Sequence, residues 1–170
     1  MSREKLPLPL PFEELLRRHQ REILRYLVRL CGDREDAADL FQETWLRAYR
    51  AYPRLNPYSD ARAWLYSIAV NLCRNRARDG ARRRRVIAGK QRRDQKTSVI
   101  ARVTTDNDGF AAIHLRELLA RLPARQREAV HLRYFAGLSY AEIAVSMGSS
   151  AESARANVFQ AMKKLQAMRE

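Results

Sequence analysis

The stretch LSYAEIAVSMGSSAESARANVFQAMKKL, residues 138–165, contains the pattern of two helices separated by a glycine turn. Ser139 suits the N-cap of the first helix, because Glu142 three residues later completes a capping box. Gly148 stands where helices often end on a left-handed residue, and the serine pair behind it can cap the next helix. A short capped helix, a glycine turn and a longer capped helix are typical of a helix-turn-helix, whose second helix lies in the major groove of DNA.

The second of these helices has an apolar face and a polar face. Its apolar side chains recur every three or four residues and predict a buried stripe of Ala154, Val158, Ala161, Met162, Leu165 and Met168. The other face carries Arg155, Asn157, Phe159, Gln160, Lys163 and Lys164. Arginine and amide side chains form bidentate hydrogen bonds with base edges, and lysines contact phosphates. An ordinary amphipathic helix would have the same two faces. DNA binding is favoured because this helix follows a short capped helix and a glycine turn.

The charge of the chain is concentrated in one band. Its 170 residues carry a formal net charge of +14, and residues 74–93 alone hold 10 basic side chains and 1 acidic side chain. Such a band attracts a polyanion, either a nucleic acid or an anionic membrane surface. The length suits one medium domain or two small ones, and two small domains would bury little surface each, so partners should contribute to stability.

The sequence offers little for catalysis or metal binding. Cys31 and Cys73 both lie in apolar helical patterns, so we expect two buried free thiols and a reducing compartment. The three histidines share no close spacing with a cysteine or with each other, and no glycine-rich phosphate loop or nucleophile elbow is present. We therefore expect no catalytic residues, no metal and no cofactor. The proline-broken first twelve residues predict neither a signal peptide nor membrane insertion, which favours a cytoplasmic protein.

The N-terminal part predicts a bundle of three helices. Helical spacing of apolar residues predicts them over residues 12–31, 33–52 and 61–78, and PRLNPYSD at 53–60 interrupts the pattern. The side chains expected to point inward from the second helix are Ala37, Leu40, Phe41, Thr44, Trp45, Ala48 and Tyr49. Those expected on its outward face are Asp39, Gln42, Glu43 and Arg47. Three amphipathic helices suffice for one small bundle.

A polar segment without periodicity separates this bundle from the C-terminal helices. We predict a flexible linker over residues 82–112, which is long for a compact domain and therefore suits either a tether or a segment that lies in a partner's groove. Helical patterns resume at IHLRELLARL and ARQREAVHLRYF, on either side of Pro123, and lead into the helix-turn-helix. The prediction is an all-α protein with two small helical domains, residues 1–81 and 113–170.

Both ends of the chain resemble one protein family. LLARLPARQREAVHLRYFAGLSYAEIAVSMGSS resembles the promoter-binding C-terminal domain of bacterial extracytoplasmic-function (ECF) sigma factors. DAADLFQETWLRAY and AWLYSIAVNL are similar to that family's N-terminal domain, which binds core RNA polymerase and the downstream promoter element. The two ends occur in the family's order and at the expected separation, which makes the resemblance more specific than either motif alone.

The resemblance implies a function for individual residues. The positions that match the family's contact with the coiled-coil clamp of the largest polymerase subunit are Asp39, Leu40, Gln42 and Glu43. Those that match the −10 element loop and the helix beside the melted strand are Asn56, Pro57, Tyr58, Trp64, Asn71, Arg74, Asn75 and Arg78. Those on the −35 element side of the recognition helix are Arg155, Ala156, Asn157, Phe159, Gln160 and Lys163. The linker is similar to the family segment that passes through the polymerase cleft.

The sequence departs from the family pattern at three positions of the helix-turn-helix. Ser149 replaces the usual aliphatic residue after the turn glycine, Ala154 stands where a valine is common, and Asn157 replaces a frequent basic residue. The resemblance implies an alternative sigma subunit that binds core RNA polymerase and promoter DNA and is usually held by an anti-sigma factor. The residues alone leave a stand-alone helix-turn-helix regulator as the alternative. In either case, the exposed Phe159 would contact a DNA base or a protein partner such as an anti-sigma factor.

Overall fold

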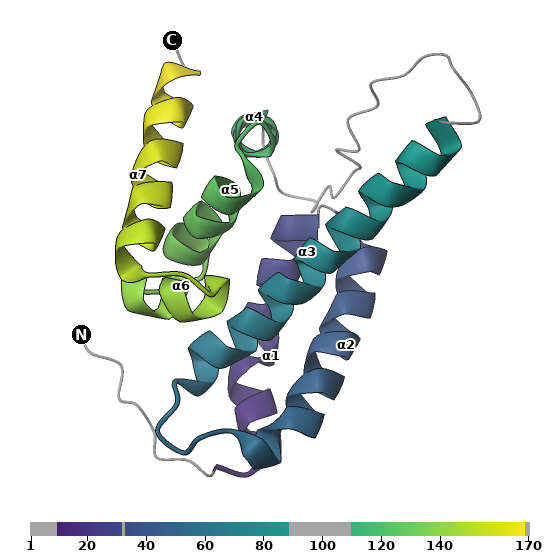
Figure 1. Ribbon diagram of the computed structural model, residues 1–170, viewed down its shortest axis with the longest axis vertical. Helices are drawn as coiled ribbons and strands as arrows, with labels where there is room; N and C mark the ends of the chain where they lie inside the picture. Colours follow the sequence, from purple (N-terminus) through teal and green to yellow (C-terminus); the bar gives the residue numbers. More distant parts are fainter. Residues whose placement is uncertain (1–9, 32, 89–109, 169–170) are drawn as a thin grey trace.

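The computed structural model describes residues 10–31, 33–88 and 110–168, and within them all regular structure is helical, as predicted (Figure 1). The N-terminal helices are α1 (Phe12–Cys31), α2 (Arg34–Ala51) and α3 (Ala61–Ala88). The C-terminal helices are α4 (Phe110–Ala120), α5 (Ala124–Val130), α6 (Tyr140–Met147) and α7 (Ala151–Ala167). A 3-10 turn at Tyr52–Arg54 follows α2, and a π-helical turn at His131–Phe135 follows α5.

The N-terminal helices pack through the apolar faces that their sequences predict. α1 buries Leu15, Ile23 and Leu27, and α2 is capped by Asp33, whose carboxylate accepts a hydrogen bond from the amide of Asp36 at 2.9 Å. Tyr49 was expected to point inward, but its side chain is 61% exposed. Tyr49 lies at the edge of the buried stripe, where its ring packs edge-on against that of Phe12, with ring centroids 5.2 Å apart. The other side of the Tyr49 ring faces solvent.

The boundary between the N-terminal bundle and the linker differs from the prediction. The linker was expected from residue 82, whereas α3 continues to Ala88 and α4 begins at Phe110. Arginine and alanine are good helix formers, so a run of them extends a helix even where the apolar stripe has ended. The remainder of the predicted linker, residues 89–109, lies outside the described residues.

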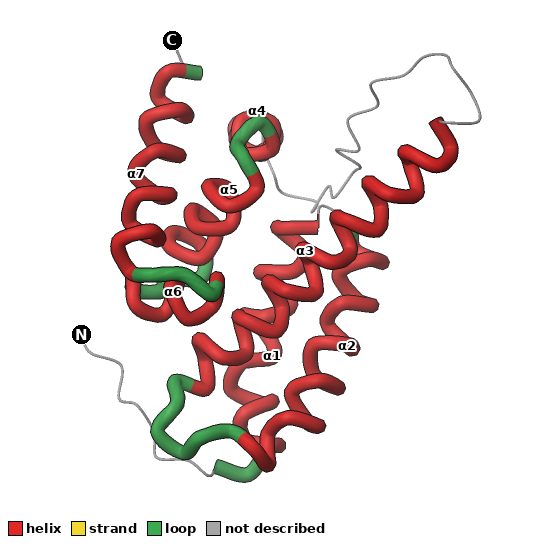
Figure 2. Tube along the Cα trace, viewed as in Figure 1, coloured by secondary structure: helices red, strands yellow, loops and turns green. Residues whose placement is uncertain are grey.

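The helix-turn-helix has the local structure that its sequence predicts. Ser139 and Glu142 form both hydrogen bonds of a capping box at the start of α6, and Gly148 ends that helix with φ 60°. Ser150 caps α7 by accepting a hydrogen bond from the amide of Ser153 at 3.1 Å. The stripe that holds α7 against the domain is buried at Ala154, Val158 and Ala161. Figure 2 shows the loop that joins the two helices.

The two groups of helices share one core, which the prediction of two tethered domains did not anticipate. Leu65, Tyr66 and Val70 of α3 belong to the same buried cluster as Ile143 and Met147 of α6. The hydroxyl of Ser146 on α6 also donates a hydrogen bond to the carbonyl of Ala63 on α3, at 3.1 Å. In Figure 1, α3 accordingly lies between the other N-terminal helices and the C-terminal helices. We call this contact between α3 and the C-terminal domain the interdomain seam.

Candidate functional site

The outward face of α2 carries three of the four residues predicted to contact a partner there. Asp39 and Gln42 are exposed, and Glu43 is half-buried and accepts a hydrogen bond from Nε of Arg47 at 2.6 Å. Leu40 is 6% exposed and belongs to the core, so the structure corrects its assignment to the contact face. Because helix positions three and four residues apart share a face, the other three form one polar, acidic patch.

The loop between α2 and α3 presents an aromatic side chain to solvent. Asn56, Pro57 and Tyr58 are all exposed, and the ring of Tyr58 is 93% exposed. The side-chain oxygen of Asn56 accepts a hydrogen bond from the amide of Tyr58 at 2.9 Å, which makes an Asx turn. Asp60 ends the loop and caps α3 by accepting from the amide of Ala63 at 3.0 Å. The loop is therefore held at both ends, while Tyr58 is available for stacking.

The residues predicted on the DNA-facing side of α3 fall into two environments. Asn71, Asn75 and Arg78 are exposed, so the structure leaves them open to a ligand. Trp64 is half-buried and packs against Tyr52, with ring centroids 6.4 Å apart.

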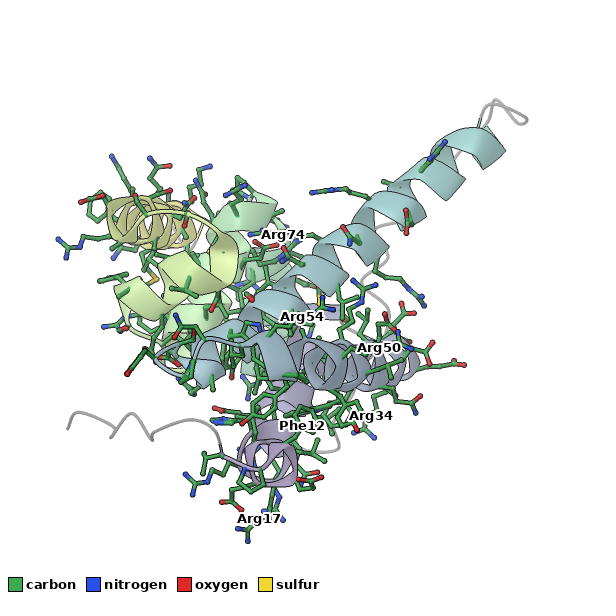
Figure 3. All side chains as sticks on the ribbon, turned by 60° about the horizontal axis from the view of Figure 1, so that its bottom comes forward. Phe12, Arg17, Arg34, Arg50, Arg54 and Arg74 are labelled. Atoms are coloured by element: carbon green, nitrogen blue, oxygen red, sulfur yellow. The ribbon has the colours of Figure 1, made fainter. Side chains whose placement is uncertain are left out.

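Arg74 is held at the interdomain seam by a carboxylate of the C-terminal domain. Its Nη2 lies 2.7 Å from Oε2 of Glu128, its Nε donates to both carboxylate oxygens at 3.1 Å, and only 18% of the Arg74 side chain and 7% of the Glu128 side chain are exposed. The hydrogen bond to Glu128 raises the pKa of Arg74 above its ordinary value and outweighs the opposing effect of burial. Figure 3 shows Arg74 where α3 meets the C-terminal helices, while Arg17 points away from them. In this arrangement the guanidinium of Arg74 is paired within the chain rather than presented to solvent.

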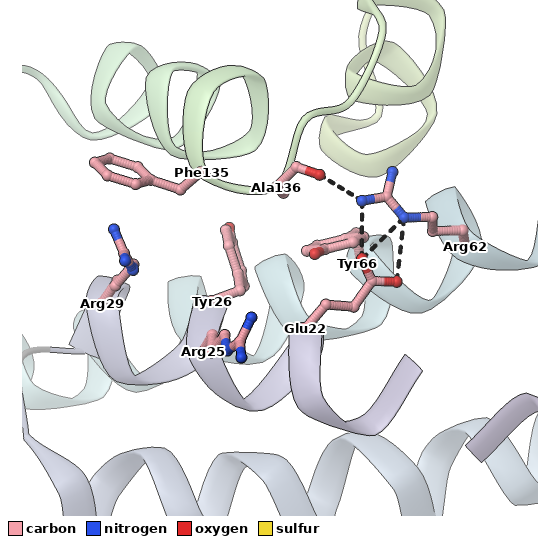
Figure 4. Close-up of a pocket in the computed structure, with 8 residues that line it drawn as sticks. All are labelled: Glu22, Arg25, Tyr26, Arg29, Arg62, Tyr66, Phe135 and Ala136. Carbon is pink, nitrogen blue, oxygen red and sulfur yellow. Dashed lines mark hydrogen bonds and ion pairs between the residues drawn. The ribbon is translucent and has the colours of Figure 1, made fainter. Parts of the chain in front are cut away.

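A second polar group crosses the seam nearer the start of α3. Arg62 on α3 pairs with Glu22 on α1, with Nη2 and Oε2 2.9 Å apart, and donates to the carbonyl of Ala136 in the C-terminal domain (Figure 4). Burial would raise the pKa of Glu22, but hydrogen bonds from His19 and Arg62 lower it below its ordinary value. These charges line a hollow of about 250 Å³, where the buried hydroxyl of Tyr26 has no hydrogen-bond partner among the described residues.

The outer face of α7 remains open to solvent. Exposed side chains on it are Arg155, Ala156, Phe159, Gln160, Lys163 and Lys164. Phe159 is 69% exposed, and the guanidinium of Arg155 lies 5.4 Å above the ring of Tyr140. Asn157 is half-buried, and its amide donates to the carbonyl of Ser153 at 2.8 Å, so this predicted DNA contact is already engaged with the backbone. Gln160 also accepts a hydrogen bond at 3.0 Å, from Gln126 of α5.

The residues that form the interdomain seam were not predicted from the sequence. Glu128 and Ser146 are polar residues inside apolar helical patterns, and each pairs with an N-terminal residue far away in the chain. A polar residue within an apolar helical stripe indicates that a buried hydrogen bond will form, because buried polar groups are nearly always paired. It does not indicate which distant residue supplies the other half of that bond. Within the described part of the chain, no three His, Cys, Asp or Glu residues group as a metal site. No described helix is long and apolar enough to cross a membrane.

Comparisons with known proteins identify both halves of the chain. Residues 15–84 match the family model of Sigma-70 region 2, and residues 113–165 match that of Sigma-70, region 4. The chain is 31% identical over 154 residues to RNA polymerase sigma factor CarQ of Myxococcus xanthus, with 91% of this chain and 86% of CarQ covered. It is 30% identical over 151 residues to ECF RNA polymerase sigma factor SigL of Mycobacterium tuberculosis, with 86% and 82% covered.

Solved structures of the same fold agree with this assignment. Sigma factor RpoE, in a co-crystal structure with the anti-sigma factor NepR from Bartonella quintana, matches with a TM-score of 0.71 at 24% identity, over 92% of this chain and 94% of that one. CnrH, in complex with the cytosolic domain of CnrY, matches with a TM-score of 0.67 at 23% identity, over 92% of this chain and 86% of that one. The chain therefore belongs to the ECF family of RNA polymerase sigma factors, and it is an alternative sigma factor that directs transcription initiation.

Proposed function

We propose that three surfaces of this sigma factor divide the work of initiation: the acidic patch on α2 binds core RNA polymerase, the loop at Asn56–Tyr58 captures a base of the −10 element, and α7 binds the −35 element. The observation that carries the proposal is the placement of all three on solvent-exposed parts of one chain. Asp39 and Gln42 are exposed on α2, Tyr58 is exposed on its loop, and Arg155 is exposed on α7.

The loop is suited to hold an unstacked base. An aromatic ring on a constrained loop binds the face of any base by stacking, which contributes about 1–3 kcal/mol. Extruding a base from a duplex costs a few kcal/mol, so a site that binds only the extruded base shifts the equilibrium toward melted DNA. Tyr58 supplies the ring and Asn56 supplies amide groups beside it, while the exposed Asn71, Asn75 and Arg78 lie on the helix that follows.

Initiation requires the interdomain seam to open. Arg74 is among the residues proposed to face the melted strand, yet it is paired with Glu128 in the closed arrangement. Core polymerase that binds the two domains at separated places would stabilise the open form, because a ligand shifts an equilibrium toward the state it binds more tightly. The closed arrangement is then the form in which the free chain exposes α7 but sequesters part of α3.

An anti-sigma factor is a second proposed partner. One solved structure that matches this fold is sigma factor RpoE in complex with the anti-sigma factor NepR, and another is CnrH in complex with the cytosolic domain of CnrY. A protein that binds across both domains of this chain would hold the seam closed and cover the polymerase-binding patch. The 69% exposed Phe159 on α7 is available to either such a partner or a thymine methyl. We further propose that the chain acts in the cytoplasm and without catalytic residues of its own.

The test is reconstitution with core RNA polymerase. We expect the purified chain to form a stable complex with core enzyme and to support specific initiation, and we expect Asp39→Arg with Glu43→Arg to weaken that complex at least tenfold. The reason is that both carboxylates lie on the outward face of α2, where reversal of charge removes attraction without disturbing the core.

Glu117→Arg is the matched control, because it reverses an exposed carboxylate on α4, in the other domain. Thermal unfolding of all variants separates loss of binding from loss of fold. Duplex binding that needs no core enzyme, together with failure to associate with core, would instead indicate a stand-alone helix-turn-helix regulator and overturn the proposal.

A further inference from the structure

The two cysteines of the chain meet inside the N-terminal bundle. Cys31 is the last residue of α1 and Cys73 lies in the middle of α3, and their sulfur atoms are 3.9 Å apart. Both thiols are free and half-buried rather than fully buried as the sequence predicts. The three proposed surfaces of the sigma factor use neither residue, so the pair needs an explanation of its own.

The surroundings of the pair favour reaction between the two sulfurs. The chain places no third cysteine near them, since it contains only two. Beside them, Arg76 of α3 forms an ion pair with Asp36 in the first turn of α2, which links these two helices close to the end of α1. A hydrogen bond from the Cys73 thiol lowers the pKa of Cys31 below its ordinary value, whereas the same hydrogen bond and burial raise the pKa of Cys73. Cys31 is accordingly the better nucleophile.

We propose that Cys31 and Cys73 form a redox-active dithiol, which hydroperoxides convert reversibly to an intramolecular disulfide between α1 and α3. A disulfide needs its sulfurs about 2.0 Å apart, so each of the two atoms has to move by only about 1 Å from the observed separation. The inference concerns the N-terminal bundle alone and does not depend on the proposed function.

The reaction is balanced with a hydroperoxide as the two-electron oxidant. The Cys31 thiolate attacks one peroxide oxygen, so that an S–O bond forms, the O–O bond breaks, and the leaving oxygen departs as water or an alcohol after protonation. The Cys73 sulfur then attacks the sulfenic sulfur of Cys31. The S–S bond forms, the S–O bond breaks, and hydroxide leaves with the Cys73 proton as water. A dithiol reductant reverses the change by exchange.

The disulfide would hold the end of α1 against α3. It would close a loop that contains all of α2, and cross-links of this length stabilise a fold chiefly by restricting the unfolded chain. We expect the oxidised chain to unfold about 5–10 °C higher than the reduced chain.

The experiment treats the full chain with hydrogen peroxide, blocks remaining thiols with an alkylating reagent, and maps peptides by mass spectrometry without reduction. The expected result is a monomer that has lost two hydrogen atoms, contains a peptide linking Cys31 to Cys73, and returns to two alkylatable thiols after dithiothreitol. This measurement uses the unmodified protein, so it does not depend on whether any variant folds.

Cys31→Ser and Cys73→Ser provide the controls. Each should remain monomeric and helical, form no intramolecular link, and show no rise in thermal midpoint on oxidation. Two alkylatable thiols in the peroxide-treated chain would overturn the proposal. So would oxidation of Cys31 to sulfinic acid without a link, or a link only between two chains.

Discussion

The two helices proposed to face promoter DNA, α3 and α7, differ in what covers them. On α7 the polar face is open, and Arg155 contacts only the ring of its neighbour Tyr140 among the interactions described. On α3 one face is buried against the C-terminal domain, and Arg74 is paired with Glu128. An arginine is thus exposed on α7, whereas on α3 an arginine is held in an ion pair within the chain. If both helices face DNA as proposed, the closed chain therefore restricts α3 more than α7, where Asn157 and Gln160 are the residues already hydrogen-bonded within the chain.

The largest expected effect comes from breaking the charge pair at the seam. Glu128→Ala leaves Arg74 partly buried without its partner, and for buried pairs this costs about 3–5 kcal/mol. Because 18% of the Arg74 side chain already reaches solvent, we expect the lower end, about 3 kcal/mol, against the closed arrangement. Small-angle X-ray scattering should show a larger radius of gyration, and thermal unfolding a lower midpoint.

Glu117→Ala is the control for this substitution, since it removes an exposed carboxylate from α4 and should change neither measurement. Glu128→Ala avoids every residue assigned to polymerase or DNA, so a change in its shape is not a change in ligand contacts. An unaltered radius of gyration and midpoint would show that the pair does not stabilise the seam.

Acid should destabilise the chain through a buried histidine, His131, in the π-helical turn after α5. Burial, followed by the charges of Arg127 and Arg29, lowers the pKa of His131 to about 4 from 6.5. Between these two pKa values the unfolded chain binds more protons than the folded chain. The stabilisation of the fold by neutral His131 is therefore complete above about pH 6.5 and is lost as the pH falls toward 4. We expect a loss of about 2 kcal/mol in unfolding free energy between about pH 7 and pH 5.

Denaturant titrations at several pH values test this expectation. His131→Gln should remove the corresponding part of the pH dependence, whereas His114→Gln, on the exposed surface of α4, should leave it in place. Acidic groups such as Glu22 contribute equally to all three chains and cancel in the comparison. The same slope in His131→Gln and the unmodified chain would contradict the assignment.

The smallest expected effect concerns the open helix. If Arg155 forms hydrogen bonds with a guanine, Arg155→Ala should weaken holoenzyme binding to its preferred upstream sequence about tenfold, or about 1.4 kcal/mol, with a much smaller loss on scrambled duplex. Lys164→Ala, two turns further along α7, should cause similar losses on every sequence. Binding to a library of upstream sequences measures both. Uniform losses for Arg155→Ala would make it a phosphate contact.

Much of the local structure could be predicted because it depends on neighbouring residues. The capping box of Ser139 and Glu142 and the left-handed turn at Gly148 involve positions at most a few turns apart, and both were confirmed. The predicted stripe of α7 is buried at Ala154, Val158 and Ala161 but only half-buried at Met162, Leu165 and Met168, nearer the end of the helix. The three exposed residues of the loop before α3 could be predicted for the same reason, since two prolines and an asparagine exclude a helix there. The residue assignments to polymerase and DNA came from the family resemblance and stay predictions.

How the two domains meet could not be predicted, because it depends on the packing of helices that are distant in the chain. Periodicity already predicts that Leu40 points inward, and its 6% exposure agrees, so it is the contact assignment implied by the family resemblance that the structure corrects. The pairings of Arg74 with Glu128 and Cys31 with Cys73 join residues 54 and 42 positions apart. Helical periodicity carries information over a turn or two, whereas such contacts depend on the packing of whole helices. The sequence by itself therefore determined the helices, their caps and the family, and packing determined which of their polar residues remain available.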